Sequence, residues 1–175
     1  MPEPGAAEQG RQERPQEGGS VARVRAALKA AGHPDTIRAF PEGTRTAEDA
    51  ARAVGCSVAE IAKSLVFRQK GSARPVLVVA SGADRVDLAR VAAVLGAPVE
   101  RADGRWVREA TGFAIGGVAP VAHLTPPVVL VEARVMALER VWAAAGSPAH
   151  VFETTPGRLL ALSGGRVADV AEQPR

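Results

Sequence analysis

The sequence predicts an α+β domain with a mixed, mostly antiparallel, barrel-like central sheet and surrounding helices. Helical and strand-like segments intermix without the regular βαβ alternation of a parallel sheet. Residues 63–67 and 75–79 are apolar runs joined by a short turn-prone stretch, which is typical of a β-hairpin. The 175 residues fall in the usual range for one domain, and no later linker divides the chain.

Helix signals recur along the chain. Residues 20–31 place apolar side chains on one face, with Ser20 as the expected cap. Thr46 precedes an alanine-rich helix that runs to Val54, and residues 57–60 have the spacing of a capping box. Further helices are expected over residues 87–95, 104–110, 134–145 and 155–162.

Strand signals lie between these helices. The central hairpin is the clearest, and residues 128–131 form a continuous apolar run of the kind that a buried strand has. A turn is expected at residues 41–43. Shorter strands are expected over residues 36–40, 98–101 and 149–153, with a closing stretch at 168–170.

The first 19 residues are expected to form a disordered tail, and residues 20–175 the folded domain. The tail is rich in Pro, Gly, Glu, Gln and Arg, so it lacks the apolar surface that would offset its ordering entropy. Its net charge is −2, whereas the remainder carries +5. A mildly basic body is compatible with a phosphate-bearing partner, although many basic proteins bind no nucleic acid.

Composition also predicts the compartment. The single cysteine, Cys56, excludes an internal disulfide and fits a reducing environment. The first twenty residues contain no apolar run of the kind that a secretory signal has. No stretch approaches the roughly 18 apolar residues that a membrane span requires. A cytoplasmic protein with no membrane partner is therefore expected.

Several common chemistries lack their residues in this chain. His33, His123 and His150 are far apart in sequence, so no metal site is expected. The phosphate-binding loop, the dinucleotide fingerprint and the Gly-x-Ser-x-Gly nucleophile motif are all absent. Cys56 precedes a helix, where a nucleophile could sit, but no base adjoins it. A small buried residue at a helix junction is the stronger interpretation.

Lys63 is the first candidate functional residue. It stands at the start of an apolar strand in Ile61-Ala-Lys-Ser-Leu-Val-Phe67, and the chain has only two other lysines. A lysine there could hold a phosphate or a carbonyl oxygen. On pattern alone the stronger interpretation is an edge charge that discourages strand pairing.

The second candidate is the glycine-rich stretch Thr111-Gly-Phe-Ala-Ile-Gly-Gly-Val-Ala-Pro120. Gly116 and Gly117 free the backbone to turn and to expose consecutive N–H groups, and Pro120 stiffens the exit. Such N–H groups can stabilise an oxyanion. The alternative is a tight turn between strands, and the loop alone is weakly specific.

Together, in this order and spacing, the two stretches resemble the YbaK/ProX family of free-standing aminoacyl-tRNA editing domains, related to the insertion domain of bacterial prolyl-tRNA synthetases. The resemblance extends from about Ser20 to Val170, almost the whole chain beyond the tail. It includes further matching stretches at residues 46–51, 76–82, 86–87 and 95–96. The fold that it implies is a mixed α/β domain with a central barrel-like sheet.

The resemblance implies a trans-editing aminoacyl-tRNA deacylase that needs no metal or organic cofactor. Its substrate would be tRNA-Pro carrying cysteine, alanine or another small amino acid. Lys63 would hold the terminal adenosine or its phosphates, and the backbone of Gly116 and Gly117 would face the ester carbonyl and a water. Residues expected to bind substrate are Thr46, Ser64, Ser81, Gly82, Asp87, Val118, Pro120 and His123.

This chain departs from the family pattern in places. Residue 122 is Ala where many members have Gly before the histidine, and Ser64 stands where the alanine-editing branch often has Asn. Thr46 and Asp87 could equally be helix caps. His123 could act as a base, but a structural role is at least as well supported. The resemblance instead implies that the ribose hydroxyl of the substrate positions the water, or that a cysteine substrate attacks with its own thiol.

Two other readings remain open. The same fold could bind an aminoacyl-tRNA end or a synthetase, prolyl-tRNA synthetase in particular, without hydrolysis. A general RNA-binding protein would need exposed aromatic residues for base stacking, and the chain has no Tyr and few Phe or Trp. No DNA partner is expected. Basic residues that could contact acceptor-stem phosphates, although solvated surface charge is the default for each, are Arg68, Lys70, Arg74, Arg85 and Arg105.

Overall fold

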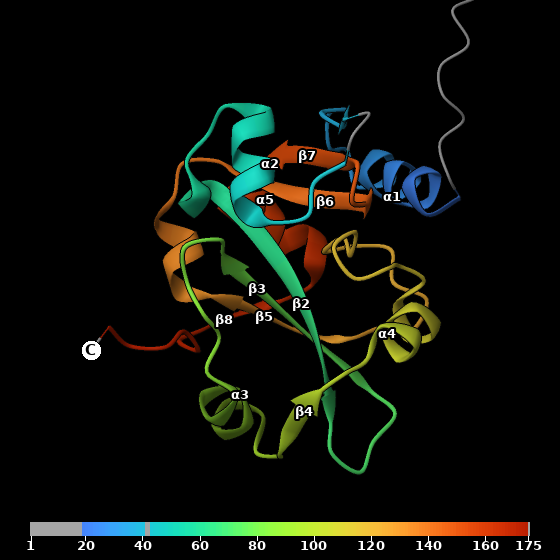
Figure 1. Cartoon of the computed structure of the whole chain (residues 1–175). Coiled ribbons are helices and arrows are strands. Elements are labelled where there is room, and N and C mark those ends of the chain that lie inside the picture. Colours follow the sequence, from blue (N-terminus) through green and yellow to red (C-terminus); the bar gives the residue numbers. More distant parts are fainter. Residues whose placement is uncertain (1–18, 41–42, 175) are drawn as a thin grey trace, which may run out of the picture.

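The computed structural model describes residues 19–40 and 43–174 (Figure 1). The expected tail therefore lies outside the described residues apart from Gly19, as does most of the turn expected at 41–43. The helical elements are α1 Gly19–Ala30, α2 Ala47–Val54, η1 Val58–Glu60, α3 Leu88–Leu95, α4 Gly104–Thr111, η2 Ala133–Ala137 and α5 Pro156–Ser163. The strands are β1 Arg38–Ala39, β2 Ile61–Gln69, β3 Pro75–Ser81, β4 Val99–Arg101, β5 Val128–Glu132, β6 Val141–Ser147, β7 His150–Thr154 and β8 Arg166–Ala168.

The strands form one mixed sheet, which confirms the predicted α+β class. Its order is β1-β7-β6-β2-β3-β5-β8, and β4 pairs with β2 off this path. The β1–β7, β7–β6, β2–β3 and β2–β4 pairings are antiparallel. The β2–β6, β3–β5 and β5–β8 pairings are parallel. The predicted hairpin is β2 and β3, which lie at the centre of the molecule (Figure 1).

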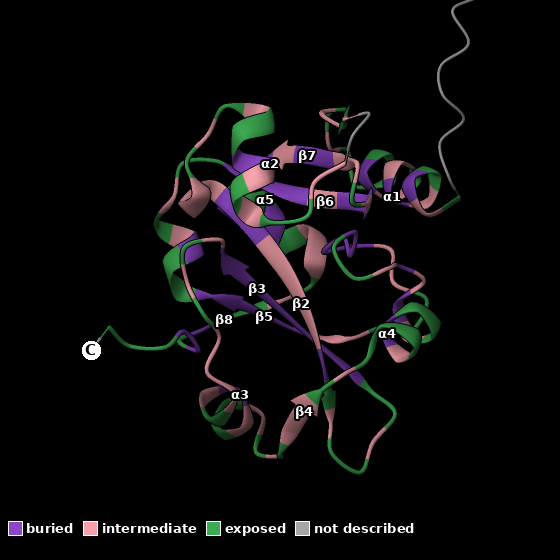
Figure 2. Ribbon diagram, in the orientation of Figure 1, coloured by how far each residue is buried: buried purple, intermediate pink, exposed green. Residues whose placement is uncertain are grey.

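Strand β3 is buried along its whole length (Figure 2). Leu77 and Val79 belong to a core cluster that also holds residues of α1, α4 and α5. Val76 and Val78 belong to a second cluster, with Val91 of α3. Because successive side chains of a strand point to opposite faces, the continuous apolar run of β3 follows from burial on both faces.

The predicted helix boundaries are largely confirmed. Thr46 caps α2 by accepting a hydrogen bond from the Asp49 N–H, and the capping box of residues 57–60 is present in η1. Asp87 caps α3 in the same way as Thr46 caps α2. One detail differs, because α1 already includes the expected cap Ser20.

The helix predicted over residues 134–145 is wrong. Only Ala133–Ala137 forms a short 3-10 helix, and Val141–Ser147 is strand β6. This alanine-rich segment lies between β2 and β7, which pair with its backbone on both sides. Tertiary pairing therefore overrides local helix propensity. The small residues also let α1 lie close, since a Cβ on Gly146 would come within 2.7 Å of the Ser20 carbonyl oxygen.

The sheet splits along the outer edge of β2. At the start of β2, Ile61 and Ala62 pair with β6, and at its end Phe67–Gln69 pair with β4. Within the described part of the chain, no strand pairs with residues 63–66 on that edge. These four residues are only partly buried, in contrast to β3 beside them (Figure 2).

Strand alternation identifies which backbone groups face the split. The Gly82 N–H donates to the Ile61 carbonyl oxygen, so odd-numbered residues of β2 bond to β3. The Lys70 N–H donates to the Pro98 carbonyl oxygen, so even-numbered residues point toward the β4 and β6 edge. Since backbone groups of an antiparallel strand alternate between its two neighbours, the N–H and C=O of Ser64 point into the gap between β6 and β4.

Candidate functional site

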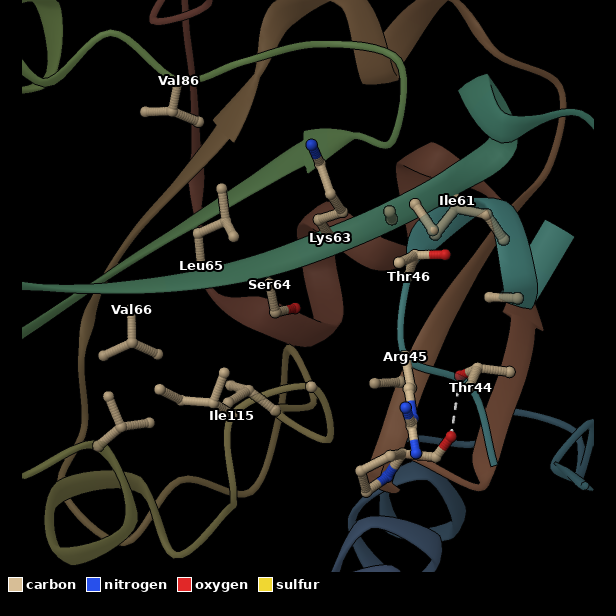
Figure 3. A pocket seen from close by; sticks show the side chains of 18 of the residues that line it. Thr44, Arg45, Thr46, Ile61, Lys63, Ser64, Leu65, Val66, Val86 and Ile115 are labelled. Atoms are coloured by element: carbon tan, nitrogen blue, oxygen red, sulfur yellow. Dashed lines mark hydrogen bonds between the residues drawn. The ribbon is translucent and has the colours of Figure 1, made fainter. Parts of the chain in front are cut away.

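A cavity of about 640 Å³ opens at the split in the sheet. Residues 61–67 of β2 line it on both sides of the strand. Lys63 and Leu65 extend to one side of β2, and Ser64 and Val66 extend to the other, toward Ile115 (Figure 3). The rest of the wall comes from the segment before α2, the loop after β3, the end of β4, the glycine loop and the turn between β6 and β7.

Lys63 is held in place by the loop that follows β3. Its Nζ donates to the Asp84 carbonyl oxygen at 2.7 Å. The Asp84 carboxylate in turn accepts from Arg134 Nη1 at 2.7 Å, which fixes the loop to η2. Burial lowers the pKa of the Lys63 ammonium, against the opposing attraction of Asp84 and Glu48. The partly desolvated charge is therefore positioned to gain from an anionic ligand.

Gly116 and Gly117 have different structural roles. Gly116 lines the cavity with a φ of 87°, which L side chains rarely adopt, although a Cβ there would lie at an ordinary contact distance of 3.8 Å from Pro148 Cγ. The Gly117 N–H closes a tight turn by donating to the Ala114 carbonyl oxygen at 2.9 Å. Gly117 packs against β6, where a Cβ would come within 2.6 Å of Ser147 Cα. Gly117 therefore permits close approach of the loop to β6, and Gly116 is the glycine that faces the cavity.

A buried network holds the rest of the glycine loop. Thr111 Oγ1 donates to the Val107 carbonyl oxygen and accepts from the Phe113 N–H. Arg23 of α1 donates through Nε to the Ala122 carbonyl oxygen at 2.8 Å, and its guanidinium lies 4.6 Å from the Phe113 ring centroid. Ala122 has a φ of 63°, a region that disfavours residues other than glycine. The anchoring by Arg23 maintains this strained conformation.

His123 belongs to this network and does not line the cavity. Its Nε2 lies 2.6 Å from the Ala119 carbonyl oxygen, and its ring packs edge-on against Phe113. Nδ1 is buried without a hydrogen-bond partner. Burial lowers the pKa of His123 below the ordinary value, so the neutral ring is the form that packs here.

The other residues predicted to bind substrate fall into two groups. Thr46, Ser64 and Val118 line the cavity with Lys63 and Gly116. The others do not line it: Ser81, Gly82, Asp87 and Pro120. Ser81 Oγ donates to the Ala59 carbonyl oxygen, and Asp87 caps α3. Gly82 is needed for space, since a Cβ there would meet the Val58 carbonyl oxygen at 2.5 Å.

Three arginines at the cavity were not singled out together from sequence. Arg45, Arg85 and Arg101 line it and are exposed. Among the residues that the structure describes, none of the three guanidinium groups has a carboxylate within 4.0 Å. Arg45 precedes α2, Arg85 lies in the loop after β3 and Arg101 ends β4, so no local pattern could have grouped them. With Lys63 they make a cationic rim suited to phosphate.

The imidazole that lines the cavity is His150, not His123. Its Nδ1 lies 2.6 Å from Ser147 Oγ, which also accepts from the Ala149 N–H. Thr44 Oγ1 donates to the Pro148 carbonyl oxygen in the same turn, as the dashed line in Figure 3 marks. The β6–β7 turn is thus firmly structured where it contacts the glycine loop.

The described part of the chain comprises residues 19–40 and 43–174. No group of His, Cys, Asp and Glu side chains there is placed to hold a metal ion. No helix in those ranges is long and apolar enough to cross a membrane.

Comparison with known proteins decides the family. The profile of the aminoacyl-tRNA editing domain family matches residues 41–162, well over half of the chain. The chain belongs to this family. The resemblance inferred from Lys63 and the glycine loop is thereby confirmed, and the matched region contains the whole β2 edge and both glycines of the loop.

Several relatives of this editing domain are similar over most of their length. YwhH of Bacillus subtilis (strain 168), described as uncharacterized, is 32% identical over 131 residues, covering 75% of this chain and 83% of YwhH. A crystal structure of a candidate trans-editing enzyme for prolyl tRNA synthetase has a TM-score of 0.84 and 42% identity, covering 90% of this chain and 100% of that chain. The crystal structure of hypothetical protein APE2540 has a TM-score of 0.80 and 31% sequence identity, covering 86% of this chain and 99% of that chain.

The placement of His123 predicts a pH dependence of stability. The unfolded chain takes up a proton at His123 below pH ~6.5, whereas the folded protein does so only at lower pH, since burial depresses the pKa. The free energy of unfolding should therefore fall on acidification from pH 7 to pH 5, by at most about 1.4 kcal/mol per pH unit from this residue. Urea unfolding of wild type and His123→Gln at both pH values measures it. Equal acid sensitivity of the two proteins would contradict the buried neutral role.

Proposed function

We propose that this editing domain is a deacylase that hydrolyses the ester between a wrongly attached amino acid and tRNA. The observation that supports this most is the composition of the cavity. At an edge of β2 that no described strand pairs with, it combines the partly desolvated Lys63, the glycine loop at Gly116 and three arginines that have no carboxylate within 4.0 Å among the described residues. Such a site suits a substrate that has phosphates at one end and a small polar ester at the other.

Lys63 is proposed to bind the 3′-terminal nucleotide. Its ammonium is fixed by Asp84 and lies on the same side of β2 as Val86 (Figure 3). Arg85 adjoins it closely enough to lower its pKa further. Two neighbouring cations favour an anion between them, so the phosphate of the terminal adenosine is the group that we assign to this side of the cavity.

The ester is proposed to lie between β2 and the glycine loop. Water adds to the carbonyl carbon, backbone N–H groups stabilise the oxyanion, and the bond from that carbon to the ribose oxygen breaks. The proton that the attacking water gives up passes to the leaving ribose oxygen, which releases the free amino acid and the tRNA. The neighbouring ribose hydroxyl positions the water. Orientation within the cavity supplies much of the acceleration, because the ester is already activated.

The proposed substrate is tRNA-Pro that carries cysteine, alanine or another small amino acid. The prolyl assignment comes from the similar structure described as a candidate trans-editing enzyme for prolyl tRNA synthetase. We expect a small side chain to fit, since Val66, Val107 and Val118 are among the apolar residues that line the cavity. Such walls distinguish substrates that differ by one methylene by only about 1–3 kcal/mol. A cytoplasmic site of action is part of this proposal.

The role assigned to Lys63 leads to a prediction about activity. Lys63→Ala should lower the rate of deacylation of the preferred substrate at least 100-fold, because the substitution removes a positioned cation. The measurement is deacylation of tRNA-Pro charged with cysteine, alanine, serine, threonine or proline. Lys70→Ala is the matched control, since Lys70 is an exposed lysine in the β2–β3 turn outside the cavity.

Selective hydrolysis that is lost in Lys63→Ala and kept in Lys70→Ala supports the deacylase. Binding of mischarged tRNA without hydrolysis of any species by folded wild type would favour the non-catalytic binding module instead. Near-normal activity of Lys63→Ala would overturn the role assigned to Lys63.

The role assigned to the arginine rim leads to a separate prediction. The triple variant Arg45→Gln, Arg85→Gln, Arg101→Gln should raise KM for aminoacyl-tRNA with little change in kcat. The slope of log(kcat/KM) against log salt concentration should become shallower by about 2, since each of the three contacts to a single-stranded phosphate contributes about 0.7 to that slope. Hydrolysis of the same amino acid esterified to free adenosine should hardly change. Arg158→Gln on α5 is the control, and equal losses on both substrates would contradict a phosphate role.

A further inference from the structure

The unpaired edge of β2 offers a second element that could recognise the substrate. The inference drawn from it rests on the proposed function. Ser64 directs its N–H and C=O into the gap where β6 has ended its pairing and β4 has not begun it. The cavity lies in this gap, with Ala144 of β6 and Ala102 after β4 on its walls. A strand edge of this kind is a template for one more hydrogen-bonded residue.

An aminoacyl group carries the N–Cα–C=O unit of a single strand residue. In an antiparallel pair, two directly opposed residues exchange both of their N–H···O bonds. We infer that the aminoacyl group of the substrate occupies the place of one missing strand residue opposite Ser64. The Ser64 N–H donates to the ester carbonyl oxygen, and the α-ammonium of the substrate donates to the Ser64 carbonyl oxygen.

This placement agrees with the surroundings of Ser64. Gly116 lines the same cavity, and the Ser64 side chain points toward the glycine loop side of β2 (Figure 3). The Ser64 hydroxyl is itself buried without a partner, so the recognition assigned here comes from the main chain. Because the main chain is the same for every side chain, this contact recognises any aminoacyl ester with a free α-amine. The valines around it then select by size.

The same contact adds to catalysis. As water adds to the carbonyl carbon, negative charge develops on the oxygen that the Ser64 N–H already faces. The proton transfer from the water to the leaving ribose oxygen is the same as in the proposed reaction, since Ser64 exchanges no proton. A strand edge is rigid, so this donor needs no rearrangement during the reaction.

Two protein variants test the inference. Ser64→Pro removes the N–H that faces the cavity. The backbone hydrogen bonds between β2 and β3 remain, because Lys63 and Leu65 make them and Ser64 does not. Proline is tolerated in a strand whose N–H side is unpaired. We expect a folded protein with kcat lowered roughly 100-fold. Ser64→Ala keeps this N–H and loses only the unpartnered hydroxyl, so its kcat should fall far less than that of Ser64→Pro.

A substrate analogue tests the other hydrogen bond without altering the protein. tRNA carries either the amino acid that wild type hydrolyses or its analogue with hydrogen in place of the α-amine. Each rate is divided by the spontaneous hydrolysis of the same ester. We expect the acceleration by the enzyme to fall at least about tenfold for the analogue, equivalent to one lost hydrogen bond to a charged group.

The outcomes separate this inference from the proposed function. Equal acceleration of both esters by an active enzyme would overturn the main-chain recognition and leave the deacylase intact. Full activity of a folded Ser64→Pro would do the same. A large loss in Ser64→Ala would transfer the role to the hydroxyl and also overturn it. Failure of wild type to hydrolyse any ester would overturn the proposed function itself.

Discussion

The site depends on the divergence of two strands from one edge of β2. An unpaired strand edge normally exposes hydrogen-bonding groups to water or to another chain. Among the described residues this edge lacks a partner strand at residues 63–66, because β6 pairs with the start of β2 and β4 with its end. The opening is therefore too short to pair with a strand from another molecule, yet long enough for a small group. The buried β3 supports it from the other side.

The glycine loop and the β6–β7 turn complete this opening together. Gly117 lies against Ser147 so closely that no side chain fits, and Gly116 then reaches the cavity. The loop is held from behind by Arg23 of α1, which also fixes the strained Ala122. Helix α1 and the β6–β7 turn, which are far apart in sequence, thus position a few backbone atoms, which is the kind of preorganisation that electrostatic catalysis requires.

Much of the architecture was predictable from sequence, and the errors have physical causes. Caps such as Thr46 and Asp87 act locally, so their pattern identified α2 and α3 correctly. Strand β6 was predicted as helix because alanine favours helix locally, whereas its structure depends on partner strands far away in sequence.

The residues of the candidate site likewise divide into those that the sequence identified and those that only the fold brings together. Lys63 and Gly116 were singled out because their two stretches, taken together in this order and spacing, resemble the family, and both residues line the cavity. Of the arginine rim, Arg85 was among the candidate phosphate contacts, whereas Arg45, Arg101 and His150 were missed, since these residues meet only through the fold. His123 was recognisable as a histidine after the loop, but only the structure shows that its ring is buried among Phe113 and Ala119 and does not line the cavity.

The most direct test of the central claim is a crystal structure with a non-hydrolysable aminoacyl-adenosine, in which an amide replaces the ester. The account predicts that the ligand fills the cavity at the split in the sheet. Its acyl group should lie between the edge of β2 and Gly116, and its adenosine should lie toward Lys63. A ligand bound elsewhere on the protein, or in the cavity with the acyl group away from the β2 edge, would contradict the account.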